Sequence, residues 1–219
     1  MDRHEREARG YFLWAGTYLE APPARLVALG GLSGSGKTTL GTALAPRIGA
    51  PPGALHLRSD VLRKHLAGVG DRERLPREAY GKESSEEVYR ELRRRAASAL
   101  RAGHSVVLDA VHARPEERAA AEAVAREAGA AFTGLWLEAP KESLVGRVRD
   151  RRGDASDATP DVVETQLGYE LGEIGWTRID ASGGAEASLT AAEGILFDAE
   201  TGPRERREDA RRGSQKPES

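Results

Sequence analysis

The run from Ala28 to Leu40 contains the residues whose types and spacing point most directly to chemistry. Within it, Gly31-x-x-x-x-Gly36-Lys37-Thr38 fits G-x-x-x-x-G-K-[ST], the pattern of a loop that binds phosphates. Glycines allow the backbone to curl so that successive N–H groups face phosphate oxygens. The lysine would reach the β- and γ-phosphates of ATP, and the threonine hydroxyl would ligate magnesium. The nucleotide-binding residues that this motif predicts are Gly31, Ser33, Gly34, Ser35, Gly36, Lys37, Thr38 and Thr39.

The residues on either side of the motif have the pattern that such a loop requires. Residues 26–29 form an apolar run, which predicts a buried strand. Leu40, Ala43 and Leu44 follow at helical spacing, so we expect a helix to open at Lys37. The N-terminus of that helix would add its partial positive charge to the phosphate site.

A second candidate group follows the strand that we expect over residues 54–58. Asp60 would face the γ-phosphate across a cleft, where its carboxylate would accept or orient the proton of a substrate hydroxyl. The alternative is that Asp60 caps the next helix, a role that Ser59 would fill equally well. Arg63 lies one helical turn further on and would bind an anionic or polar group of the substrate; its alternative is a solvated surface arginine.

Asp109 ends a third apolar strand, over residues 105–109. A carboxylate at this position would hold magnesium together with Thr38, through water, and its alternative is an ordinary loop aspartate. Whether Asp60 or Asp109 is the base stays open at this point. The segment after Asp109 carries Arg114 and Arg118, which we expect to contact the substrate.

Four arginines lie at the end of a helix that we expect over residues 141–151, directly before a loop of Gly, Asp and Ser: Arg147, Arg149, Arg151 and Arg152. A mobile lid that carries arginines would neutralise charge on the transferring phosphoryl group and exclude water. The alternative is a solvated helix end, which the helix dipole favours. We choose Arg147 and Arg151 as catalytic, with Lys37, because four residues of helix would place both on one face.

Composition narrows the classes of protein that are compatible with these motifs. The chain has 219 residues, which is typical of one domain with appendages, and a net charge of −2, which provides no overall basic field for nucleic acid. It has no cysteine, so disulfides, thiolate catalysis and cysteine zinc sites are excluded. No apolar run approaches the length of a membrane span, and the charged first residues are unlike a secretory signal. We therefore expect a cytoplasmic protein without membrane partners.

The order of elements predicts an α/β fold. Expected strands near residues 26–29, 54–58, 105–109, 131–137 and 176–180 alternate with expected helices near 37–47, 61–66, 83–102, 115–128, 141–151, 160–171 and 185–197. Such alternation favours a mostly parallel, five-stranded sheet in a three-layer α/β/α sandwich, the P-loop NTPase class, here kinase-like with a lid. Ligands of such sheets bind beyond the carboxyl ends of the strands, where the candidate residues would meet.

We predict three parts along the chain. Residues 1–25 would form a helical or linker segment, which either packs on the domain or joins it to a separate one, and residues 26–199 would form the kinase domain. Residues 200–219 are almost all charged or polar, so we expect disorder, with a basic nucleic-acid arm as the alternative.

These motifs together resemble the P-loop kinases of the AAA_33 and zeta-toxin type, which are related to polynucleotide kinase and chloramphenicol phosphotransferase. The chain is most similar to the ATP-binding domain that is fused behind an aminoglycoside-phosphotransferase-like domain in some bacterial proteins. The matching stretches are residues 29–38, 57–64, 106–110, 134–140 and 151–158, which together span roughly residues 26–183.

The resemblance implies an ATP:hydroxyl phosphotransferase in which Asp60 is the base and Arg63 its partner on the substrate side. It also implies an association with an aminoglycoside-phosphotransferase-like domain. One departure concerns the acceptor, because many relatives have Asp-x-Thr-Asn after the third strand and this chain has His112 in place of the asparagine. The identity of the substrate therefore does not carry over.

Three hypotheses follow for function. The first is a magnesium-dependent kinase that transfers the γ-phosphate of ATP to an alcohol group of a small molecule, as a monomer or a dimer. The second is a polynucleotide 5′-hydroxyl kinase, which the net charge of −2 supports poorly. The third is a regulatory module that binds ATP without an acceptor of its own.

Overall fold

The central feature of the structure, a computed structural model that describes residues 3–19, 22–151 and 153–198, is one five-stranded sheet. Its strands lie in the order β2-β3-β1-β4-β5, and all four neighbouring pairs are parallel. The strands are β1 (Arg25–Gly30), β2 (Leu55–Arg58), β3 (Val106–Asp109), β4 (Ala131–Glu138) and β5 (Thr177–Asp180). The prediction of a three-layer α/β sandwich is confirmed, and the sheet is wholly parallel among the described residues.

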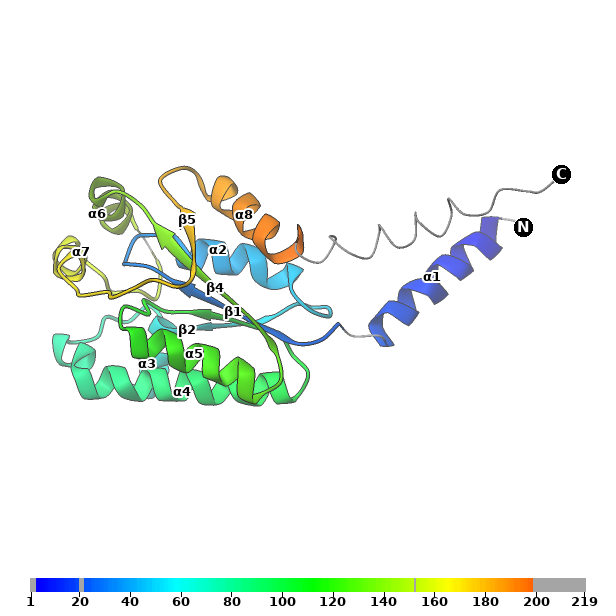
Figure 1. Cartoon of the computed structure of the whole chain (residues 1–219), viewed down its shortest axis with the longest axis horizontal. Coiled ribbons are helices and arrows are strands. Elements are labelled where there is room, and N and C mark those ends of the chain that lie inside the picture. The colour runs from blue at the N-terminus through cyan, green and yellow to red at the C-terminus, as the bar shows by residue number, and fades with distance from the viewer. Residues whose placement is uncertain (1–2, 20–21, 152, 199–219) are drawn as a thin grey trace.

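Helices cover both faces of this sheet (Figure 1). The helices are α1 (Arg3–Leu19), α2 (Lys37–Leu44), α3 (Ser59–Leu66), α4 (Lys82–Arg101), α5 (Pro115–Glu127), α6 (Lys141–Asp150), α7 (Pro160–Leu167) and α8 (Ala185–Glu193), with short turns η1 (Ala45–Arg47), η2 (Arg77–Tyr80) and η3 (Gly194–Asp198). Helices α3, α4 and α5 lie on one face, and α2 and α8 lie on the other. No helix in the described part of the chain is long and apolar enough to cross a membrane.

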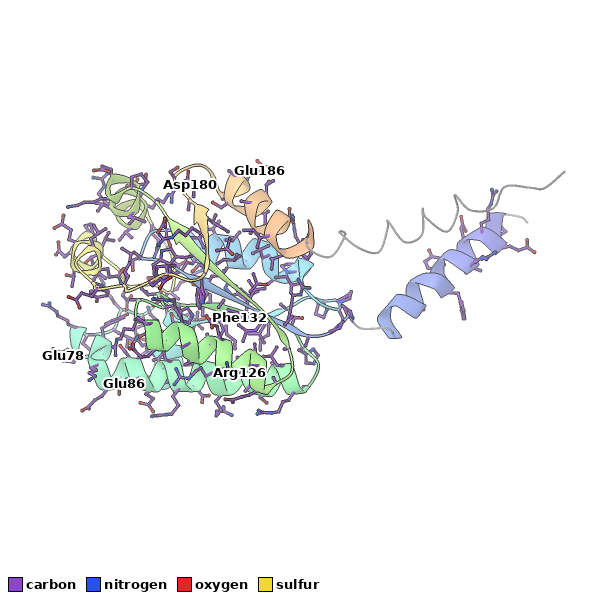
Figure 2. All side chains as sticks on the ribbon, viewed as in Figure 1. Glu78, Glu86, Arg126, Phe132, Asp180 and Glu186 are labelled. Atoms are coloured by element: carbon purple, nitrogen blue, oxygen red, sulfur yellow. The ribbon has the colours of Figure 1, made fainter. Side chains whose placement is uncertain are left out.

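The alternation of side chains along β1 explains the two cores. Leu26 and Ala28 pack with the helices of the α3–α5 face, whereas Val27 and Leu29 pack with α2 and α8. Because both faces of the strand are buried, it is a continuous apolar run, as expected for the centre of a parallel sheet. Charged side chains such as Glu86 and Glu186 lie on the outer surfaces of the helices (Figure 2).

Helices α6 and α7 lie together at one end of the sheet, away from α1 (Figure 1). They share a third, smaller apolar cluster formed by Leu144, Val148 and Val163. This separate cluster holds the two helices as a unit above the edge of the sheet where the candidate site residues are.

Helix α1 occupies most of the N-terminal segment and stands apart from the sheet (Figure 1). Its aromatic side chains Tyr11 and Phe12 are 77% and 80% exposed, so these two do not pack on the domain. The segment expected to be disordered, residues 200–219, lies outside the described residues.

Two helix boundaries differ from the sequence prediction. Strand β2 continues through Arg58 and leads directly into α3 at Ser59, so Asp60 lies in the first turn and neither Ser59 nor Asp60 caps the helix. Helix α7 ends at Leu167, with Gly168 as its C-cap, rather than near Leu171, which packs against the core on the α3–α5 face.

Gly134 in β4 provides a test of the packing of the sheet. A Cβ atom there would lie 2.4 Å from the indole ring of Trp176, which is itself buried. We expect Gly134→Ala to lower the free energy of unfolding by about 1–3 kcal/mol in urea denaturation, because the added methyl group would overpack the core. The control is Gly146→Ala in α6, where a Cβ meets nothing within 4 Å; it should stabilise by about 1 kcal/mol, through helix propensity alone. Equal effects of the two substitutions would contradict this packing.

Candidate functional site

The glycine-rich loop of residues 31–38 connects β1 to α2 in a conformation that needs its glycines. Gly31, Gly34 and Gly36 have φ values of 134°, 83° and 95°, a region that other residues rarely adopt. A Cβ on Gly34 would also lie 2.4 Å from the carbonyl oxygen of Leu144 in α6. The loop is therefore shaped by backbone geometry, with its N–H groups at the N-terminus of α2, where anions bind favourably.

Lys37 is buried at the first position of α2, inside the curl of the loop. Its ammonium donates to the carbonyl oxygens of Gly31, at 2.8 Å, and Leu32, at 3.0 Å. Burial lowers the pKa of Lys37, and the negative charges of Asp109 and Asp60 act in the opposite direction. The two carboxylates thus favour the charged form of Lys37 inside the loop, where the ammonium would bind a phosphate.

Asp109, at the end of β3, meets the first turn of α2. The Thr38 hydroxyl donates to Asp109 Oδ2 at 2.6 Å, and His56 Nε2 lies 3.4 Å from the same oxygen. Burial alone would raise the pKa of Asp109, but the nearby His56 imidazole, the charge of Lys37 and the Thr38 hydroxyl hold it below its usual value. The carboxylate therefore stays ionised at neutral pH.

This pair of oxygen donors fits magnesium. Magnesium in nucleotide enzymes takes one or two carboxylates, and the phosphates and water complete its coordination. The Thr38 hydroxyl and the Asp109 carboxylate have that chemistry and are in contact. Within residues 3–19, 22–151 and 153–198 no group of three His, Asp or Glu side chains could hold a metal by itself. The donors therefore suit a metal that arrives with a nucleotide.

Asp60, in the first turn of α3, lies in the same cleft as the glycine-rich loop. Burial raises its pKa above the usual value, and the charge of Asp109 adds to the rise. The Ser156 hydroxyl, through hydrogen bonding, and the cations Lys37 and Arg63 act in the opposite direction. Asp60 is thus a more basic carboxylate than Asp109 in the same site, which favours Asp60 as the acceptor of a proton.

The cleft that contains these groups has a volume of about 1260 Å³. Most of the predicted site residues line it: Ser33, Gly34, Gly36, Lys37, Thr38, Thr39, Asp60, Arg63, Asp109, Arg114 and Arg151. Gly31, Ser35, Arg118 and Arg147 do not. Gly31 and Ser35 are nevertheless part of the loop, where they accept hydrogen bonds from Lys37.

Arg63 lines the cleft one turn beyond Asp60 and is held firmly in place. It donates to the carbonyl oxygen of Ala79 at 2.8 Å, and its guanidinium lies 4.8 Å from the centre of the Tyr80 ring. Its Nε has no hydrogen-bond partner among the described residues. Arg114, the other predicted substrate contact in the cleft, is exposed and lies 3.6 Å from Glu117.

Two predicted arginines have structural roles that the sequence did not indicate. Arg118 donates to four main-chain carbonyl oxygens, those of His112, Ala113, Leu171 and Glu173. These bonds occupy its guanidinium, so the expectation that Arg118 contacts substrate is corrected. It joins the segment after β3 to the chain that follows α7.

Arg147 does not line the cleft and reaches the turn that follows β5. It donates to the carbonyl oxygens of Ala181, at 2.8 Å, and Gly183, at 3.0 Å, and more weakly to Gly34, at 3.4 Å. The expectation that Arg147 is a catalytic arginine of a lid is therefore corrected, because its guanidinium is occupied by main-chain oxygens and Arg147 does not line the cleft. Three of the four arginines are described by the structure, and of these only Arg151 lines the cleft. The fourth, Arg152, lies outside the described residues.

Sequence reasoning missed Gln166 of α7. Its Oε1 accepts a hydrogen bond of 2.8 Å from the backbone N–H of Ser33, and its side chain is buried. This contact ties α7 to the glycine-rich loop. No local pattern indicates it, because the two residues are 133 positions apart.

The 153–159 loop, between α6 and α7, is a second part of the site whose contacts the sequence did not indicate. Asp154 accepts a hydrogen bond of 2.7 Å from Arg58, whose Nε lies 3.8 Å from Asp109. Asp157 accepts hydrogen bonds from Lys64 and Tyr80. The loop is thus attached to the wall of the cleft.

His112, in the segment after β3, is buried. Its φ is 50°, and its ring packs edge-on against Tyr89 and Trp176 at 5.5 and 5.1 Å. Neither ring nitrogen has a hydrogen-bond partner among the described residues. Burial lowers the pKa of His112 to about 3, so the imidazole is neutral in the folded protein.

Comparison with known proteins adds a family and a fold. The AAA_33 family model, described as an AAA domain, matches residues 26–170. An uncharacterised protein of Mycobacterium tuberculosis (strain H37Rv) is 30% identical over 190 residues, which cover 85% of this chain and 37% of that protein. The chain therefore spans little more than a third of the length of this curated relative.

Solved structures share the fold. A sugar kinase of Janibacter sp. superposes with a TM-score of 0.58 at 23% identity, over 80% of this chain and 95% of that one. An APS kinase of Mycobacterium tuberculosis in complex with AMPPNP and APS gives a TM-score of 0.56 at 22% identity, over 80% and 98%. At this identity the likeness shows the α/β P-loop kinase fold.

The buried, neutral His112 makes the stability of the fold depend on pH. Between pH 6.5 and about 3 the unfolded chain binds a proton at this imidazole that the folded protein does not, so stability falls as the pH falls. From pH 6.5 to 5.5 we expect the wild type to lose about 1 kcal/mol more unfolding free energy than His112→Asn, in urea denaturation. Asparagine tolerates a positive φ and does not titrate. Parallel pH dependences of the two proteins would disprove a buried neutral imidazole.

Proposed function

This chain belongs to the AAA_33 family of AAA domains, and we propose that it is a magnesium-dependent kinase that transfers the γ-phosphate of ATP to a hydroxyl group of a small molecule. The observation that carries the proposal is the position of Asp60. Asp60, a partly buried carboxylate with a raised pKa, shares one cleft with the glycine-rich loop, the buried Lys37 and the ionised Asp109. Binding of ATP alone does not require such a carboxylate.

A module that only binds ATP has no use for such a carboxylate, because phosphate binding needs cations and amide groups rather than a base. Asp60 lines the same cleft as the nucleotide loop but belongs to α3, and the acceptor would enter beside it. Its raised pKa brings the carboxylate closer to the neutral range in which general bases work best. This arrangement favours transfer to an acceptor over the regulatory module.

In the donor half of the proposed site, this chain's residues bind and orient ATP. Lys37 and the loop amides bind the phosphates, and Gln166 holds the loop through the N–H of Ser33. Thr38 and Asp109 would hold magnesium, which supplies charge neutralisation at the phosphates when bound. Arg151, which lines the cleft, would add a cation near the transferring group.

In the acceptor half, Asp60 receives the proton of the substrate hydroxyl. The hydroxyl oxygen forms the new bond to the γ-phosphorus, the bond from that phosphorus to the β-phosphate oxygen breaks, and ADP leaves. Arg63 and Arg114 also line the cleft and would contact polar groups of the acceptor. Sugar and APS kinases share the fold, which supports a small molecule as the acceptor class.

A polynucleotide acceptor is less well supported by the charges of the cleft. Its lining mixes cations such as Arg74 and Arg77 with the carboxylates of Asp161 and Glu170, rather than forming a basic channel. Labelling of an oligonucleotide 5′ end would revive the polynucleotide alternative.

The relative from Mycobacterium is much longer than this chain, so a partner domain of the aminoglycoside-phosphotransferase-like kind belongs to the proposal as well.

Substitution of the base tests the proposal directly. We expect Asp60→Asn to lower kcat by about 10²- to 10⁴-fold in a coupled assay of ATP consumption across sugars, antibiotics and nucleosides. ATP binding, measured by calorimetry, should not change, because the glycine-rich loop is intact. Asp180→Asn at the exposed end of β5 is the matched control and should behave as wild type. Acceptor-dependent turnover that survives Asp60→Asn would exclude Asp60 as the base.

A second substitution tests the metal ligand. In Asp109→Asn the neutral amide attracts a divalent cation less strongly, so we expect the magnesium concentration for half-maximal ATP binding to rise by about 10- to 100-fold. Calorimetry of ATP binding with magnesium and with EDTA provides a readout that does not require turnover. If the variant and the wild type respond identically to magnesium, Asp109 is not a metal ligand.

A further inference from the structure

We infer that Asp157 is a positioning residue of the proposed reaction, because it fastens the 153–159 loop to the acceptor wall of the cleft and so holds Ser156 against Asp60. This inference rests on the kinase function proposed above. It gives a role to the contacts of the 153–159 loop, which the proposed binding of ATP and of the acceptor does not by itself require. The wall in question consists of α3, η2 and the chain between them.

The carboxylate of Asp157 is the meeting point of three hydrogen bonds from that wall. Lys64 of α3 donates to Oδ1 at 3.0 Å, and both the backbone N–H of Leu75, at 3.0 Å, and the Tyr80 hydroxyl, at 2.7 Å, donate to Oδ2. Burial opposes ionisation of Asp157, but these three donors together hold its pKa below the usual value. We call this set of bonds between Asp157 and the wall the tether. Its carboxylate is therefore ionised at neutral pH.

Lys64 has no alternative carboxylate nearby in the described chain. Its side chain is 1% exposed, that of Asp157 is 11% exposed, and its other hydrogen-bond partner is the carbonyl oxygen of Glu73 at 2.6 Å. A buried ammonium that loses its counter-ion is strongly destabilising. The pair therefore specifies one position of the loop, because other positions would leave Lys64 uncompensated.

A second ion pair fastens the same loop three residues earlier. Arg58, at the end of β2, donates to Asp154 Oδ1 at 2.7 Å, and the N–H of Ser156 donates to that same oxygen at 2.9 Å. Ser156 thus lies between two anchored aspartates. Its hydroxyl interacts with Asp60 by hydrogen bonding, so the two anchors determine where that contact forms.

The tether also reaches the acceptor contact Arg63. Tyr80 donates its hydroxyl to Asp157 while its ring lies 4.8 Å from the Arg63 guanidinium. Movement of the loop would therefore disturb both the proposed base and its neighbouring cation. We conclude that Asp157 acts through Asp60 and Arg63 rather than by touching the substrate.

The experiment separates positioning from simple support of the fold. Asp157→Asn alone leaves Lys64 buried without a counter-ion, so the double variant Asp157→Asn, Lys64→Met removes both charges and keeps similar volumes. We expect the double variant to unfold at a temperature near that of the wild type. Its kcat should nevertheless fall by about 10- to 100-fold, with the KM for ATP unchanged, because misplacement of reacting groups costs rate.

Two further variants grade the effect. Tyr80→Phe removes one of the three donors and keeps the aromatic ring under Arg63, so its kcat should lie between those of the wild type and the double variant. Asp150→Asn removes an exposed charge at the end of α6, outside the cleft, and should not change kcat. A folded double variant with wild-type kcat would overturn the positioning role.

Amide hydrogen exchange in the full chain provides a readout that does not depend on turnover. We expect residues 153–158 to exchange faster in the double variant than in the wild type, and the rest of the sheet to be unaffected. Unchanged exchange in this loop would overturn the tether. If the wild type transfers phosphate to no acceptor, the proposed function fails, whereas the exchange result still decides whether Asp157 holds the loop.

Discussion

The parallel register between β1 and β3 is the constraint on which the rest of the site depends. It pairs Leu29 with Asp109, so a carboxylate at the end of one strand lies beside the start of the glycine-rich loop at the end of the next. Thr38, in the first turn of α2, then reaches that carboxylate at 2.6 Å. A shift of one residue would turn Asp109 to the other face, and it would also exchange Val107 and Leu108 between the two cores. Apolar packing on both faces therefore protects the geometry of the polar site.

The charged side chains at the carboxyl ends of these strands are balanced by nearby partners. The ammonium of Lys37 binds loop carbonyl oxygens, and Asp109 is held ionised by its neighbours. Asp60 differs, because burial raises its pKa. Two carboxylates in one cleft therefore have opposite pKa shifts, which suits the roles of metal ligand and base that we propose for them. The Lys64–Asp157 pair extends the same balance to the loop above them.

The arginines show where sequence reasoning succeeded and where it did not. Arg147 and Arg151 were expected on one helix face, but α6 ends at Asp150, and Arg151 has an extended backbone with φ −60° and ψ 137°. The two side chains consequently point to different places. Arg118 was expected near the substrate, yet its guanidinium satisfies carbonyl oxygens that lie more than fifty residues away as well as local ones. A side chain's role depends on which backbone groups need a donor, and a sequence does not display those.

The sequence by itself determined the glycine-rich loop, the five strands and the α/β order of the chain. These features are local, because a motif spans eight contiguous residues, and apolar periods of two and 3.6 residues are visible within one element. Only the tertiary structure decided which polar groups meet. Lys64 and Asp157 are 93 positions apart, and Ser33 and Gln166 are 133 apart, so their pairing depends on how α6 and α7 cross the edge of the sheet. The proposed nucleotide side could therefore be predicted from contiguous residues, whereas the wall of the proposed acceptor side is built from distant ones.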